Sequence, residues 1–130
     1  MENNTPKTSE ILSLLKDKYK QMDNLMTFTK EMEKAAGIND LEALRTVLAM
    51  RQEAMDKIDS ISKDVGKILG EMDPPDRDRM KQILNQTGEP MKFNDQLENN
   101  ISDTNRLTYQ LLQKIIDLDK TINQRIQKGV

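Results

Sequence analysis

The sequence contains neither cysteine nor histidine. Without these residues the chain cannot form a disulfide, a thiolate nucleophile, a Ser-His-Asp or Cys-His catalytic group, or a histidine-containing zinc or di-iron site. Its five glycines do not combine into a phosphate-binding loop or a dinucleotide fingerprint. We therefore expect no enzymatic activity, no catalytic residue, no metal site and no cofactor.

Aromatic residues, long apolar runs and an excess of charge of one sign are also missing. Two Phe, two Tyr and no Trp do not predict a compact aromatic core, whereas an elongated helical bundle needs few of them. The 20 basic and 22 acidic residues interleave, so no basic stripe predicts nucleic-acid binding or attachment to an anionic membrane. No run of apolar residues is long enough to insert into a membrane, and the polar segment Met1 to Glu10 does not resemble a signal peptide. We expect a soluble cytoplasmic protein.

What the chain does contain is helical periodicity, interrupted by a few turn and cap signals. Thr8 or Ser9 can begin a first helix after Pro6, and Gly37 can end it. Asn39 with Glu42 forms a capping pattern for a second helix. The sequences Asp73-Pro74-Pro75 and Gly88-Glu89-Pro90 mark two later breaks. The prediction is an all-α fold, an elongated antiparallel bundle with coiled-coil-like packing, in a single domain 1–130 with long helices at about 9–36, 40–72 and 91–127 and a short helix at about 75–87.

The second predicted helix carries the most regular pattern in the chain. Ten positions follow one another at alternating intervals of three and four residues, and eight of them are apolar. A second apolar line beside the first widens the apolar face to about half of the helix circumference. This width predicts that the second helix packs on two neighbours and lies in the middle of the bundle. The ten positions are Leu41, Leu44, Leu48, Arg51, Met55, Ile58, Ser62, Val65, Leu69 and Met72.

The last predicted helix has two apolar lines, and one bundle need not bury both. Its main stripe extends from Phe93 to Ile126, and Tyr109, Leu112 and Ile116 form a smaller strip beside it. One hypothesis is that the second half of the helix forms a groove for a helical partner; the alternative is that the main stripe packs on the other long helices. Exchange of this helix between two copies is also possible. The candidate protein-binding residues are Leu107, Tyr109, Leu111, Leu112, Ile115, Ile116, Leu118, Ile122 and Ile126.

The nine methionines are consistent with two interpretations. They can fill a helical core, or they can line an adaptable surface that repacks around different ligands.

The start of the second helix carries a family resemblance. Asn39-Asp40-Leu41-Glu42-Ala43-Leu44, followed by Arg51-Gln52-Glu53 and Ile58-Asp59, resembles the FlgN family of flagellar type III export chaperones. The outline of a long first helix, a glycine-containing turn, a broken middle and an amphipathic last helix is also similar, and the shorter FliT chaperones share it. The resemblance implies a cytoplasmic, non-enzymatic chaperone in flagellum biogenesis. Its partners would be hook-associated junction or cap proteins, held by their helical terminal segments until delivery to the export apparatus.

Two other functions remain open from the sequence. A structural or oligomerising coiled-coil scaffold or tether would account equally well for the line from Leu41 to Met72. A small secreted helical-hairpin effector is a third possibility.

Overall fold

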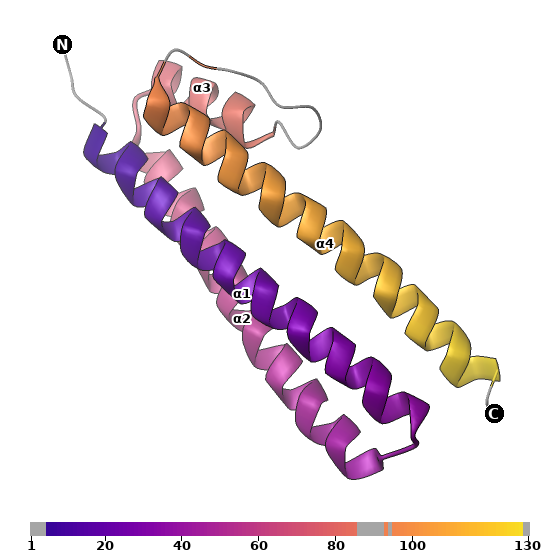
Figure 1. Ribbon diagram of the computed structural model, residues 1–130. Helices are drawn as coiled ribbons and strands as arrows, with labels where there is room; N and C mark the ends of the chain where they lie inside the picture. The colour runs from indigo at the N-terminus through magenta and orange to yellow at the C-terminus, as the bar shows by residue number, and fades with distance from the viewer. Residues whose placement is uncertain (1–4, 86–92, 94, 129–130) are drawn as a thin grey trace.

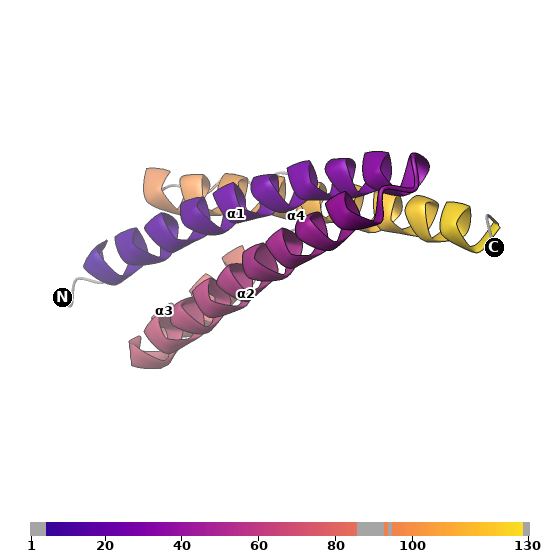
Figure 2. The same ribbon diagram turned by 90° about the horizontal axis from the view of Figure 1, so that it is seen from below.

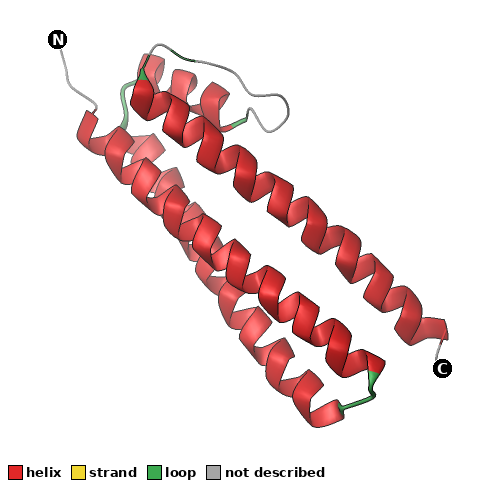
Figure 3. Cartoon of the chain, in the orientation of Figure 1, coloured by secondary structure: helices red, strands yellow, loops and turns green. Residues whose placement is uncertain are grey.

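The computed structural model describes residues 5–85, 93 and 95–128. It consists of α1 (Thr5–Gly37), α2 (Leu41–Glu71), α3 (Pro74–Leu84) and α4 (Gln96–Lys128). Within these residues no strand occurs (Figure 3), and the prediction of an all-helical fold is confirmed. None of the described helices combines the length and the apolar character that a membrane crossing requires.

The three long helices lie side by side, with α1 between the other two (Figures 1 and 2). α2 runs antiparallel to α1, and α4 runs in the same direction as α1. α1 packs on both α2 and α4, whereas no Cα atom of α2 lies within 8 Å of one of α4 in the described part of the chain. The prediction that the second helix occupies the middle was therefore wrong: the first helix does.

The core consists of three successive layers along the bundle. The first layer joins all four helices through Ile11, Val65, Met80, Ile83 and Ile101, among others. The second and third layers contain side chains from the three long helices alone. In the second, Leu25 and Ala54 meet Ile115, and in the third, Met32, Val47 and Ile122 meet. All three long helices contribute to every layer, and α1 is the central one because it alone packs closely on both of the others.

The turn between α1 and α2 differs from its prediction by one residue. Gly37 is the last residue of α1, but Asn39, not a glycine, adopts the left-handed conformation with φ of 57°. Asparagine tolerates this conformation better than most residues do. Asp40, rather than Asn39, caps α2: its carboxylate accepts a hydrogen bond from the backbone N–H of Ala43 at 3.0 Å. Because Asn39 makes the turn, the next residue is free to act as the cap.

Other helix boundaries also moved. α1 begins at Thr5, before the predicted caps. Pro6 fits into its first turn because the backbone N–H groups of a first turn have no partner within the helix, so the N–H that proline lacks is not needed there. Asp73 precedes α3 without making a side-chain cap hydrogen bond. Instead Arg77 of α3 donates to the carbonyl oxygens of Leu69, Gly70 and Met72, which satisfies the end of α2.

The predicted end of the short helix at 87 and the predicted start of the last helix at 91 fall outside the described residues. Phe93 was expected to be helical, but the structure places it before α4, half-buried against the first core layer. α4 begins at Gln96, where the Asp95 carboxylate accepts from the backbone N–H of Leu97 at 2.8 Å. An aspartate in this position is a standard helix cap.

The apolar line of α2 is also rotated from its predicted register. The core takes Val47, Ala54, Ile61 and Ile68 of the second apolar line together with part of the first. Met50 of the second line and Leu41, Leu48 and Met55 of the first remain exposed. α1 is the only long helix with Cα atoms within 8 Å of those of α2, so part of the wide apolar face stays uncovered by the described helices. The buried or half-buried positions of α2 are Leu44, Val47, Arg51, Ala54, Ile58, Ile61, Val65, Ile68 and Leu69.

Candidate partner-binding face

The nine candidate residues of α4 do not form one surface. Ile115 and Ile122 are buried in the second and third core layers. Leu111, Leu112 and Leu118 are half-buried against the same layers. Four residues are exposed, but on different sides of the helix: Leu107, Tyr109, Ile116 and Ile126.

An ion pair identifies the side of α4 that is turned toward α2. Nη2 of Arg51, on α2, contacts both carboxylate oxygens of Asp119, on α4, at 2.9 and 3.1 Å. Nη1 of Arg51 lies 3.2 Å from Sδ of Met32 on α1, so the guanidinium spans the space above the central helix. Both charged side chains are partly shielded from solvent. Such a pair contributes less to stability than to fixing the register of the two helices.

Exposed apolar side chains flank this ion pair on both helices. Leu48 and Met55 lie three residues before and four residues after Arg51, and they are 44% and 40% exposed. Ile116 lies three residues before Asp119, Tyr109 lies seven residues before Ile116, and they are 37% and 40% exposed. Two apolar edges therefore border the same strip between α2 and α4.

These edges belong to two rows of exposed residues, each with intervals of four and three, which together we call the α2–α4 face. In a chain that is 32% charged, each row contains one charged residue, Asp59 on α2 and Lys120 on α4. Depletion of charge around apolar and aromatic side chains is typical of the centre of a protein interface. The α2 row is Leu48, Gln52, Met55, Asp59 and Ser62, and the α4 row is Tyr109, Gln113, Ile116, Lys120 and Asn123.

Met55 and Ile116 lie at the same level of this face. The helices are antiparallel, and each rises about 1.5 Å per residue. Four residues forward from Arg51 on α2 and three residues back from Asp119 on α4 therefore reach nearly the same height. The centre of the α2–α4 face is therefore an apolar pair about one helical turn along from the ion pair.

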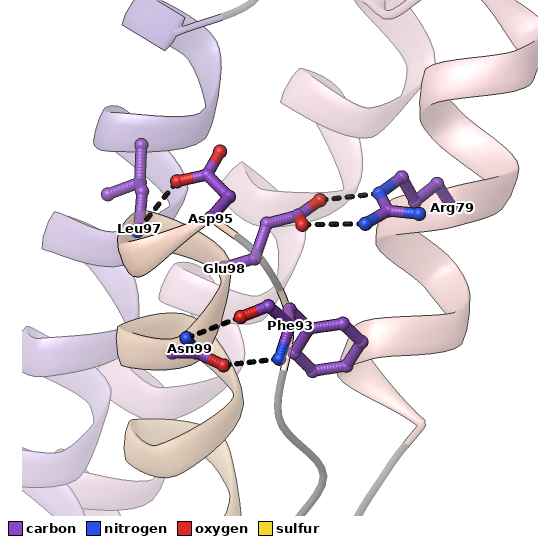
Figure 4. Close-up of polar contacts among 6 residues, drawn as sticks. All are labelled: Arg79, Phe93, Asp95, Leu97, Glu98 and Asn99. Carbon is purple, nitrogen blue, oxygen red and sulfur yellow. Dashed lines mark hydrogen bonds and ion pairs between the residues drawn. The ribbon is translucent and has the colours of Figure 1, made fainter.

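α3 packs on both α2 and α4 at the end of the bundle where α2 ends and α4 begins (Figure 1). Its side chains Met80 and Ile83 are buried in the first core layer, and Arg79 forms a two-bond ion pair with Glu98 of α4 at 2.6 and 2.8 Å (Figure 4). Asn105 of α4 donates to the carbonyl oxygen of Leu84, the last residue of α3, at 2.6 Å. Beyond this contact no described helix covers the two long helices on this side.

Two hydrogen bonds hold the segment that leads into α4. The side chain of Asn99 donates to the carbonyl oxygen of Phe93 at 2.8 Å and accepts from its backbone N–H at 2.6 Å (Figure 4). This two-bond bracket positions Phe93 against the first core layer.

Lys18 of α1 is a half-buried amine next to this face. Burial lowers the pKa of Lys18, and the nearby carboxylate of Asp59, in the α2 row, offsets part of this effect. The lowered pKa indicates that the ammonium group of Lys18 is incompletely solvated. Among the described residues there is no group of three acidic side chains suited to a metal ion.

The sequence prediction missed the α2 half of this face. Leu48 and Met55 were assigned to the core because they continue the heptad line of α2. The available signal was Arg51, a charged residue inside that line, since a charge at a core position needs a partner from a neighbouring helix.

Comparison of the chain with protein-family models, curated proteins and solved structures finds no match.

Proposed function

We propose that this protein is an export chaperone of the flagellar type III pathway. It binds the helical terminal segment of a hook-filament junction or cap protein in the cytoplasm, prevents premature assembly, and delivers this partner to the export apparatus. The proposal joins the resemblance of residues 39–59 to FlgN chaperones with the α2–α4 face. Its three long helices and one short helix act as an elongated, coiled-coil-like antiparallel scaffold without catalytic function.

The observation that carries the proposal is the pair of apolar edges beside the Arg51–Asp119 ion pair. An amphipathic helix binds by laying its apolar side chains on such a surface, with anchors spaced by three, four and seven residues. Leu48 and Met55 are seven residues apart, as are Tyr109 and Ile116. On both helices, exposed apolar side chains therefore recur at the seven-residue spacing with which a helical partner places its own anchors.

The chemistry of the face suits a chaperone that releases its partner. Met55 is flexible and polarizable, so it can adapt to different apolar side chains. The exposed apolar area amounts to about a few hundred Å², which is in the range of functional patches on monomeric proteins. Contacts of this size favour reversible binding over a permanent complex.

A coiled-coil scaffold or tether is the second candidate function. Leu41, Leu48 and Met55 are all exposed and follow each other at seven-residue intervals along α2. This line can pair with a helix of another scaffold subunit. Small-angle scattering distinguishes the two, because a scaffold forms long oligomers and a chaperone remains a compact monomer or dimer.

The chaperone proposal is tested by capture from the cytosol of the native organism. The tagged full-length chain is incubated with the extract, and bound proteins are identified by mass spectrometry. We expect an unassembled junction or cap protein, bound through its terminal helical segment. Recovery of no flagellar axial protein would contradict the proposal.

Variants of α4 provide the matched controls. Ile116→Ser changes an exposed residue of the α2–α4 face, whereas Leu107→Ser changes an exposed leucine on another side of the same helix. We expect Ile116→Ser to abolish capture and Leu107→Ser to preserve it. Leu112 is less suitable for this purpose because it packs against the second core layer.

A further inference from the structure

We propose that the partner is a single amphipathic helix that lies on the α2–α4 face in line with α3, with the end of α3 as the boundary of its binding site. This inference rests on the proposed function and specifies the position, length and chemistry of the bound segment.

α3 is an example of such a helix within the chain itself. It is amphipathic, it inserts Met80 and Ile83 into the first core layer, and polar contacts join it to both long neighbours. On the α2 side, Arg77 donates to the carbonyl oxygens at the end of that helix, and on the α4 side Arg79 pairs with Glu98. A partner helix on the adjacent face would continue the packing that α3 begins.

The structure also gives the length of the strip that no described helix covers. α3 ends at Leu84, whose carbonyl is joined to Asn105 of α4. The strip of α4 from Asn105 to Ile126, which contains the α4 row of the face, is about 30 Å long at about 1.5 Å per residue. A helix of about 20 residues fills this length. A longer helix projects beyond the open end or meets α3.

Charge and area favour a foreign helix over a second copy of this chain. The two rows contain only Asp59 and Lys120 as charged residues, and the charges of Arg51 and Asp119 between the rows are paired with each other. The face therefore fits a helix whose apolar line is flanked by uncharged or few charged side chains. Self-association of two globular copies buries about 800 Å² per partner in a standard interface. The face exposes four apolar side chains, each 37–44% exposed, which amount to about a few hundred Å² of apolar area.

The position is tested with a fluorescent synthetic peptide of about 18 residues, about 27 Å as a helix. Its leucines follow intervals of three and four, and alanine, glutamine and one Glu–Lys pair fill the other positions. A control peptide has the same composition with leucines spread around the helix. Binding to the full chain is measured by fluorescence anisotropy. We expect only the amphipathic peptide to bind, Ile116→Ser and Met55→Ser each to weaken binding at least tenfold, and Leu107→Ser to change it less than twofold.

The length limit is tested with amphipathic peptides of about 11, 18 and 28 residues. We expect affinity to rise from the first to the second peptide and then to level off, because α3 blocks further contact. An affinity that keeps rising with the third peptide, with α3 still in place by hydrogen exchange, would overturn the boundary.

A chemical bridge provides a test that does not depend on removing an apolar contact. Because the chain has no cysteine, Met55→Cys with Ile116→Cys creates two unique attachment points across the face. A bifunctional maleimide should abolish binding of the 18-residue peptide, while a monofunctional maleimide on Met55→Cys alone should reduce it less. Unchanged binding after bridging would overturn the proposed position.

These outcomes separate the inference from the proposed function. Capture of an axial protein that Ile116→Ser does not affect overturns the position of the helix and leaves the chaperone function intact. Peptide binding at the face without capture of any axial protein supports the position and contradicts the flagellar function. Dimerisation of the chain that Ile116→Ser abolishes, measured by light scattering, would replace the partner helix with a second copy.

Discussion

Adjacent isoleucines of α4 test both the packing of the helix and the openness of its face toward α2. Ile115 is 2% exposed in the second core layer, whereas Ile116 is 37% exposed in the α2–α4 face. Substitution of either residue by alanine removes the same atoms from the same helix. Any difference in the free energy of unfolding therefore reports the environment of the side chain and not its helix propensity.

The expected magnitudes follow from this difference in burial. Ile115→Ala leaves a cavity between Leu25, Ala54 and its other neighbours, and a buried Ile→Ala change of this kind costs about 3 kcal/mol. Ile116 is only partly buried, so Ile116→Ala loses fewer contacts, and the higher helix propensity of alanine regains a few tenths of a kcal/mol. The substitution should therefore lower the free energy of unfolding by about 1 kcal/mol or less. The gap of about 2 kcal/mol corresponds to about 8 °C in melting temperature for a chain of this size.

Urea unfolding followed by far-ultraviolet circular dichroism measures both variants, and this probe suits a helical chain without Trp. A cost for Ile116→Ala equal to that for Ile115→Ala would refute the reasoning. It would mean that the α2–α4 face is covered, and the proposed binding site would lose its basis.

Three further predictions address Gly66, the Arg51–Asp119 ion pair and the half-buried amine of Lys18. Gly66→Ala should raise the free energy of unfolding by about 0.5–1 kcal/mol in a urea titration, because a Cβ atom there meets open space inside a helix. Asp119→Asn should lower the free energy of unfolding by about 1–2 kcal/mol, because it removes the counter-charge of the partly buried Arg51. Adding Arg51→Met to this variant should recover part of the loss. If the effects of the two substitutions on the free energy of unfolding were strictly additive, the ion pair would have no coupling energy. Since burial lowers the pKa of Lys18 below its ordinary 10.5, the unfolded chain binds more protons in the interval between the two values, and stability rises with pH there. Lys18→Met should therefore be more stable than the native chain at neutral pH, with a difference that shrinks as the pH approaches 10.5 and that a pH series of urea titrations would reveal.

The order and type of the helices were predictable from local signals. The breaks at Pro74-Pro75 and around Gly37 act within a few residues, so they separate the same helices in the sequence and in the structure. Observed helix boundaries differ from the predicted ones where either of two neighbouring residues could cap the helix, as with Asn39 and Asp40 at the start of α2. Phe93 was assigned to the last helix because its spacing fits the stripe, although the side chain of Asn99 holds it in a non-helical segment.

The sequence predicted residues of the α4 half of the α2–α4 face, but not those of its α2 half. Tyr109 and Ile116 were identified because their strip cannot face the same neighbour as Ile115. Leu48 and Met55 were missed because a heptad line shows that a helix has an apolar face, but not which part of a wide face its neighbours cover.

Periodicity along the chain thus determined that this protein is a set of amphipathic helices, and the absence of histidine and cysteine excluded disulfides and the catalytic groups and zinc sites that need these residues. Only the tertiary structure decided that α1 occupies the centre and that α2 and α4 meet through side chains, with none of their described Cα atoms within 8 Å of each other. The physical reason is that each long helix has more apolar surface than one neighbour can cover, so several arrangements satisfy the same pattern. Long-range contacts such as Arg51–Asp119 and the insertion of α3 between the two outer helices select one of them, and that selection leaves the α2–α4 face exposed.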